Sequence, residues 1–120
     1  MDEEKKIEKL KRIKREISRL NQLFKNLEPK KKKAVESLIK NAAFMAITLE
    51  DLQDDINING TTEEYQNGAN QKGIKKSSSV EVYNTMIKNH VQVMKALTDL
   101  LPKEEPKSTD DGFEGFVIDR

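Results

Sequence analysis

The stretch AVESLIKNAAFMAITLEDLQDDI, residues 34 to 56, decides the fold because its apolar residues fall on more than one face of a helix. We expect this helix to run from Pro29 to Ile58. A helix that is apolar nearly all round is buried on several sides. Its apolar residues are Val35, Leu38, Ile39, Ala42, Ala43, Phe44, Met45, Ala46, Ile47, Leu49, Leu52 and Ile56.

A basic amphipathic helix is expected before this stretch, from Asp2 to Leu27. Pro29 fits the first turn of a new helix and disfavours helix at Glu28, so we expect a break near Leu27 and Glu28. The apolar residues of the first helix recur at alternating steps of three and four, as Leu10, Ile13, Ile17, Leu20, Phe24 and Leu27.

A third helix is expected to follow the central one after a polar gap. Ser78 and Glu81 form a Ser-x-x-Glu capping box, which satisfies free backbone donors at a helix start. Pro102 marks the end of this helix. The apolar seam repeats at heptad spacing through Val80, Tyr83, Ile87, His90, Met94, Leu97 and Leu101.

The connector between the second and third helices, Thr61 to Ser79, is polar and long. Loops longer than about 12 to 15 residues are uncommon in compact domains unless they are functional or disordered. We expect its glycines to let the chain turn back, so that the two helices pack antiparallel, and Tyr65 and Ile74 to pin the loop.

These elements predict an all-α chain of three long helices, the second and third forming an antiparallel hairpin. The expected organisation is a basic amino-terminal helix (residues 1–28), a central helical hairpin (29–101) and an acidic, disordered tail (102–120). Hydrophobic residues make up 35% of the 120 residues and charged residues 36%, so one chain has little apolar material to bury alone. We therefore expect it to associate with further copies.

The charge of the chain is uneven along its length. Residues 1–33 carry 13 Lys or Arg against 6 Asp or Glu, whereas the whole chain has a net charge of only +1. The chain has no cysteine and no apolar run long enough to cross a membrane, so we expect a cytoplasmic protein. A basic end beside acidic parts suggests a polyanionic partner.

Catalytic and metal-binding patterns are weak in this sequence. Asp55 to Gly60, DINING, matches the start of a calcium loop, but Gln66 stands where the bidentate glutamate is needed, so we expect a helix end capped by Gly60. His90 is the only histidine, and we expect it to be buried on the helix seam. No phosphate-binding glycine loop is present. We expect no enzymatic activity, no metal and no cofactor.

The basic stripe is the feature with a physical argument for ligand binding. Cations along a helix neutralise a run of phosphates and release counterions, which gives sequence-tolerant, salt-sensitive affinity. The alternative is the solvated face of a coiled coil. The candidate DNA-binding residues are Lys5, Lys6, Lys9, Lys11, Arg12, Lys14, Arg15, Arg19, Lys30, Lys31, Lys32 and Lys33.

The runs NAAFMAITLEDLQDDI (41–56), TEEYQNGANQKGIKKSS (62–78) and VEVYNTMIKNH (80–90) resemble the small terminase subunits of tailed bacteriophages and prophages, in particular the family common in Gram-positive hosts. The resemblance covers roughly residues 34 to 101. It implies a non-enzymatic component of the packaging motor in a bacterial host cell. Its implied partners are viral double-stranded DNA, the large subunit that holds the ATPase and nuclease, and identical copies in a ring of about eight to ten.

The resemblance places the connector at a contact between subunits or at the rim of the ring, and implies neither a membrane nor a small-molecule substrate. The residues expected to form the core or the contacts between copies are Leu38, Ala42, Ala43, Ala46, Leu49, Tyr83, Ile87, His90, Met94 and Leu97. An apolar cluster in the tail is expected to dock on the large subunit through Phe113, Phe116, Val117 and Ile118. The alternatives are a helical scaffolding or adaptor protein without a DNA-binding role and a transcriptional regulator.

Overall fold

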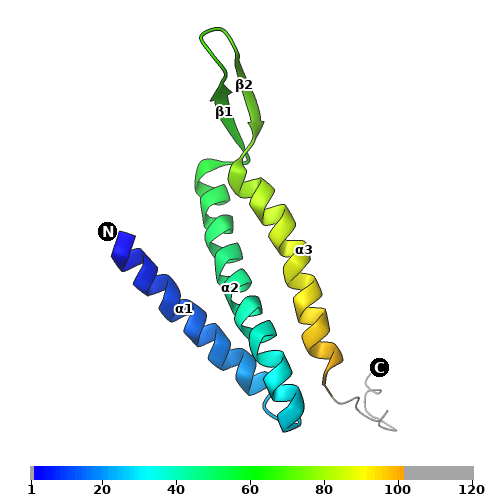
Figure 1. Ribbon diagram of the computed structural model, residues 1–120. Helices are drawn as coiled ribbons and strands as arrows, with labels where there is room; N and C mark the ends of the chain where they lie inside the picture. Colours follow the sequence, from blue (N-terminus) through cyan, green and yellow to red (C-terminus); the bar gives the residue numbers. More distant parts are fainter. Residues whose placement is uncertain (1, 102–120) are drawn as a thin grey trace, which may run out of the picture.

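A computed structural model describes residues 2–101, and helices account for 75% of them. The order of elements is α1 (Asp2–Leu23), α2 (Pro29–Asn59), β1 (Thr62–Gln66), β2 (Lys72–Lys76) and α3 (Ser78–Asp99). Helices α2 and α3 run antiparallel side by side, as predicted, and α1 packs against α2 (Figure 1).

The core lies where the three helices come closest, around the turn from α1 to α2. Leu20 and Leu97 are 1% and 0% exposed, and they bring α1 and α3 into the same apolar cluster as α2. Toward its amino end α1 leans away from α2 (Figure 1), and Leu10 is 57% exposed although it lies on the predicted seam. The buried cluster consists of Leu20, Phe24, Leu27, Val35, Ile39, Ala42, Ala43 and Leu97.

Helix α1 ends at Leu23, four residues before the predicted end. The chain then turns, with the amide of Phe24 donating to the Leu20 carbonyl at 3.0 Å and that of Leu27 donating to Phe24 at 3.4 Å. Because Pro29 holds Glu28 in an extended conformation, the reversal must be completed before it. The turn swings Phe24 and Leu27 into the core, so both remain apolar contacts as expected.

The connector is a β-hairpin, which corrects the prediction of an all-α fold. Strands β1 and β2 pair antiparallel, with Glu63 opposite Lys75 and Tyr65 opposite Gly73. Gly68 has φ +81° in the turn between the strands, a conformation that glycine adopts without steric cost. Nearly all residues of the two strands are exposed, so their sequence is polar and lacks the apolar alternation that predicts a strand.

The start of α3 also differs from the prediction by one residue. Ser77, and not Ser78, is the N-cap: its hydroxyl accepts a hydrogen bond from the amide of Val80 at 3.1 Å. The amide of Ser78 donates to Glu63 Oε1 at 3.0 Å instead. The hairpin explains the shift, because the Ser77 amide donates to the Thr61 carbonyl at 2.9 Å and keeps Ser77 extended.

Candidate nucleic-acid interface

The cations of α1 divide into two groups according to the side of the helix on which they lie. Helix α1 buries one apolar stripe against α2, and Lys9 and Arg12 are half-buried along its border. The remaining cations predicted on this helix are exposed, so the two groups have different surroundings. The exposed group is Lys5, Lys6, Lys11, Lys14, Arg15 and Arg19.

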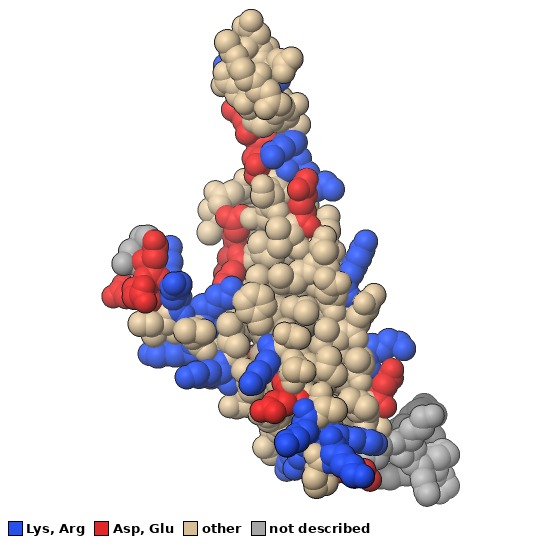
Figure 2. Space-filling model, in the orientation of Figure 1, with Lys and Arg blue, Asp and Glu red and all other residues tan. Residues whose placement is uncertain are grey.

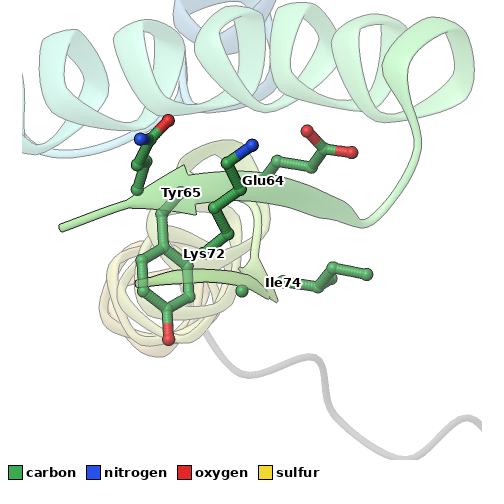
Figure 3. A pocket seen from close by; sticks show the side chains of 6 residues that line it. Glu64, Tyr65, Lys72 and Ile74 are labelled. Carbon is green, nitrogen blue, oxygen red and sulfur yellow. The ribbon is translucent and has the colours of Figure 1, made fainter. Parts of the chain in front are cut away.

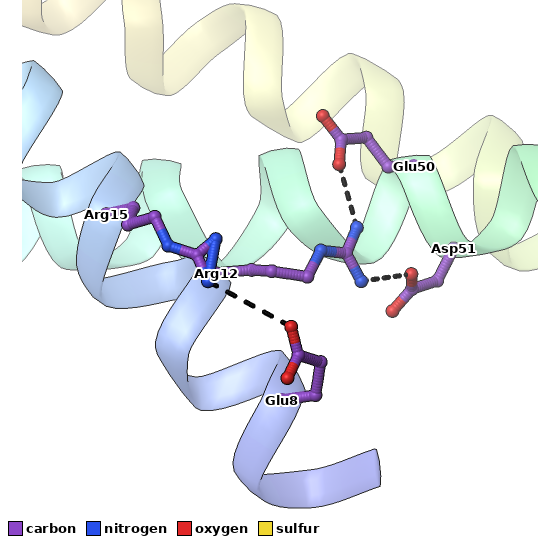
Figure 4. Close-up of polar contacts among 5 residues, drawn as sticks. All are labelled: Glu8, Arg12, Arg15, Glu50 and Asp51. Carbon is purple, nitrogen blue, oxygen red and sulfur yellow. Dashed lines mark hydrogen bonds and ion pairs between the residues drawn. The ribbon is translucent and has the colours of Figure 1, made fainter.

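Arg12 joins α1 to α2 through a forked ion pair. Its Nη1 lies 2.7 Å from Asp51 Oδ1 and its Nη2 lies 2.8 Å from Glu50 Oε1 (Figure 4). The hydrogen bonds that Arg12 donates to Asp51 and, to a smaller extent, to Glu50 raise the pKa of its guanidinium, because they favour the charged form. The predicted DNA-binding role of Arg12 therefore competes with a structural one.

Lys9 lies near the same contact, with its ammonium 5.0 Å from the ring centre of Phe44 on α2. A cation over an aromatic face is attracted by the negative face of the ring. Lys9 and Arg12 together hold the amino-terminal half of α1 beside α2, where apolar packing is thin.

Arg15 and Arg19 also have carboxylate neighbours within α1. Arg19 binds Glu16 with two hydrogen bonds of 2.9 and 2.6 Å, and Arg15 lies 3.9 Å from Glu8. Hydrogen bonding from Arg19 lowers the pKa of Glu16 despite partial burial. Arg19 is thus largely neutralised locally, whereas the exposed lysines of the described chain have few such partners.

The densest basic surface lies at the turn between α1 and α2, formed by five exposed residues that we call the turn lysines. Figure 2 shows Lys and Arg side chains gathered at this end of the molecule. Helix α2 begins here, without acidic residues in its first turn and without a side-chain cap, so its unpaired amides add positive potential. The turn lysines are Lys25, Lys30, Lys31, Lys32 and Lys33.

Lys25 was not among the predicted DNA-binding residues. The sequence showed only an isolated lysine between Phe24 and Leu27 in an apolar seam. The turn brings Lys25 together with Lys32 and Lys33 around a shallow cavity of about 450 Å³ between α1 and α2. Its spacing of five residues from the lysine run, across a proline break, is the signal that could have found it.

Four of the five acidic residues of α2 lie toward its other end, and the fifth is Glu36. Glu50, Asp51, Asp54 and Asp55 occupy its second half, and Asp55 accepts hydrogen bonds from Ser79 and from Asn59. Both hydrogen bonds lower the pKa of Asp55, and the one from Ser79 has the larger effect. The α2–α3 pair is therefore basic at the α1–α2 turn and acidic toward the hairpin.

The residues expected to form the core or the contacts between copies line the inside of the single chain. Ala42, Ala43, Leu49 and Leu97 are buried. Half-buried positions are Leu38, Ala46, Tyr83, Ile87, His90 and Met94. His90 is thus less buried than expected, and its ring makes no hydrogen bond within residues 2–101. Any contact between copies must use other surfaces as well.

The region resembling a calcium loop is a helix end, as expected. Helix α2 ends at Asn59, and Gly60, with φ +86°, donates its amide to the Ile56 carbonyl at 2.8 Å. Among residues 2–101, no group of three or more His, Cys, Asp or Glu side chains is placed to hold a metal ion. None of the helices described is both long and apolar enough to span a membrane.

The predicted docking residues Phe113, Phe116, Val117 and Ile118 lie outside the described residues.

Comparisons with protein-family models, curated proteins and solved structures found no match to this chain.

Proposed function

We propose that this chain is a small terminase subunit: a non-enzymatic, cytoplasmic protein that binds viral double-stranded DNA and recruits the large terminase subunit. The proposal rests on the sequence resemblance of residues 34–101 and on the surface of the molecule. The observation that carries the DNA-binding part is the gathering of the turn lysines beside the start of α2. Their exposed ammonium groups are available to phosphates, since α2 has no acidic residue in its first turn.

The exposed face of α1 extends this basic surface. Lys11, Lys14 and Arg15 are exposed on the side of α1 away from the stripe that packs on α2. A duplex lying across the turn and this face would meet cations from two elements. Contacts of this kind position DNA through its backbone without reading its sequence.

Self-association is supported by apolar side chains that the single chain leaves exposed. Burying several exposed large apolar side chains against another copy stabilises the assembly, because it removes apolar surface from water. A head-to-tail contact repeated around a closed circle would give a ring. Large apolar residues with 46% to 59% exposure are Ile7, Leu10, Leu23, Phe44, Val82 and Val91.

A helical scaffolding or adaptor protein is the second candidate, and the ion pairs of α1 favour it. Arg12 and Arg19 are satisfied by carboxylates, which is typical of a structural helix face. An adaptor would assemble without binding DNA. A transcriptional regulator, the third candidate, would also bind DNA. It would not stimulate the ATPase of a cognate large terminase subunit, so an ATPase assay distinguishes it from a small terminase subunit.

The DNA-binding part is tested by titrating a fluorescent duplex at several salt concentrations. Replacing Lys31, Lys32 and Lys33 with glutamine should weaken binding and reduce the salt slope by about 0.9 for each phosphate that is no longer neutralised. The matched control removes three exposed lysines of α2 and α3, by the substitutions Lys40→Gln, Lys88→Gln and Lys95→Gln.

A second variant replaces Lys11, Lys14 and Arg15 with glutamine. Unchanged affinity and salt slope in both basic-surface variants would refute a DNA interface on α1 and the turn. The hairpin lysines Lys72, Lys75 and Lys76 would then be the next candidates.

The assembly part is tested by light scattering over the accessible concentration range. We expect the mass of a ring of about eight to ten chains. A monomer throughout the range would refute the ring and leave the adaptor.

A further inference from the structure

The β-hairpin projects from the end of the α2–α3 pair, away from the apolar core (Figure 1). An isolated two-stranded hairpin is marginally stable in water, and edge strands present unpaired backbone groups that invite further pairing. Ile74 is 72% exposed and Tyr65 is 40% exposed on this hairpin. Pairing with a further strand would therefore stabilise the hairpin, and its exposed edges and apolar side chains are available for that pairing.

The hydrogen bonds at its two ends show which backbone groups point outward. The amide of Asn67 donates to the Gln71 carbonyl at 2.7 Å, and that of Ser77 donates to Thr61 at 2.9 Å. Paired and unpaired positions alternate along an antiparallel ladder, so every second residue between these ends turns its amide and carbonyl away from the partner strand. These outward residues are Thr62, Glu64, Gln66, Lys72, Ile74 and Lys76.

The two faces of the hairpin differ. Tyr65 covers the face that contains Gly73, and its ring reaches across to the neighbouring strand (Figure 3). A Cβ built on Gly73 would lie 2.6 Å from that ring, so the contact fixes the pairing of Tyr65 with Gly73. The outward residues share the opposite face, and all of them are exposed.

The two edges carry opposite charges. Strand β1 has Glu63 and Glu64 and no cation, whereas β2 has Lys72, Lys75 and Lys76 and no anion. The acidic edge of one copy therefore complements the basic edge of another copy, whereas two identical edges repel. Such complementarity favours a head-to-tail contact between copies of this chain over the pairing of like edges.

We propose that β1 of one copy pairs antiparallel with β2 of the next copy and continues the sheet from hairpin to hairpin. This inference rests on the self-association in the proposed function. Glu64 lies opposite Lys72, Ile74 or Lys76 of the neighbouring copy, because only shifts of two residues align outward backbone groups. Closure of the assembly satisfies every hairpin edge, which makes the hairpin a contact between subunits.

The absence of cysteine from the chain allows a direct cross-linking test. One chain carries Glu64→Cys in β1, and a differently tagged chain carries Lys72→Cys, Ile74→Cys or Lys76→Cys in β2. The two chains are produced together, oxidised and separated without reductant. We expect one of the three combinations to give a mixed disulfide dimer in high yield, and neither chain alone to do so.

The control combines the same β2 chain with Glu36→Cys, since Glu36 is also an exposed glutamate but lies on α2. Mixed dimers at or below the control yield, in an assembly of full ring mass, would overturn the hairpin contact and leave the proposed function standing. A wild-type chain that stays monomeric would overturn both.

Amide hydrogen exchange of the unmodified protein provides an independent measurement. In the assembled state the outward amides of Glu64 and Ile74 should exchange as slowly as the inward amides of Glu63 and Lys75. Fast exchange at the outward amides alone would contradict intermolecular pairing.

Discussion

Arg12 shows how one side chain in a basic stripe takes a structural role. Its two carboxylate partners are adjacent on α2, and the planar guanidinium reaches both. The sequence placed Arg12 correctly on α1 but could not reveal Glu50 and Asp51, which are more than 35 residues away. Spacing within one helix identifies a charged face, whereas partners across helices depend on how the helices pack.

Replacing Arg12 with glutamine should therefore loosen α1 more than it weakens DNA binding. Because the pair is partly exposed, we expect a loss of about 1 kcal/mol in the free energy of unfolding. Thermal melting at fixed protein concentration measures the loss, and Lys11→Gln is the control. A larger fall in DNA affinity for Arg12→Gln than for Lys11→Gln would contradict the structural role.

Glu16 predicts an acid sensitivity of α1. Hydrogen bonding from Arg19 lowers its pKa below the usual value of 4.5, so the folded state holds the ionised form more tightly than the unfolded state does. The stabilisation is complete above about pH 4.5 and is lost as the pH falls through the lowered pKa. Melting curves should show a smaller stability loss over this acidic range for Glu16→Gln than for the unmodified protein.

At the level of elements, apolar periodicity predicted the helices because their buried stripes are continuous. The bounds of α2 and α3 were predicted closely. For α2 this is because Pro29 marks its start and the apolar pattern stops after Ile58. The hairpin was missed because a strand exposed on both faces has no apolar alternation. Lys25 was missed because its partners are across a turn.

The cap of α3 gives a test between two adjacent serines. Ser77→Ala removes the hydroxyl that accepts from Val80 and should lower stability by about 1 kcal/mol. Ser78→Ala is the matched control, because only its backbone amide is used, and should change stability little. Equal effects would mean that the helix start is not determined by the side chain of Ser77.

At the scale of the whole molecule, the proposed DNA binding and assembly use the helices, whereas the proposed docking uses the carboxyl-terminal residues. Deleting residues 110–120 should leave the assembly mass and DNA affinity unchanged, because the turn lysines and the helices remain. The same deletion should abolish capture of the large terminase subunit in a pull-down. Undiminished capture would rule out docking through the apolar residues near the carboxyl terminus.

The length of α2 has a consequence for how this protein can change during evolution. At 31 residues it spans about 46 Å between the turn lysines and the hairpin, several times the screening length of about 8 Å in physiological salt. Charge substitutions at one end are therefore electrostatically silent at the other. Under the proposed roles of the turn lysines and the hairpin, substitutions at one end can therefore change DNA affinity without changing the contact between copies, and the two properties can diverge independently.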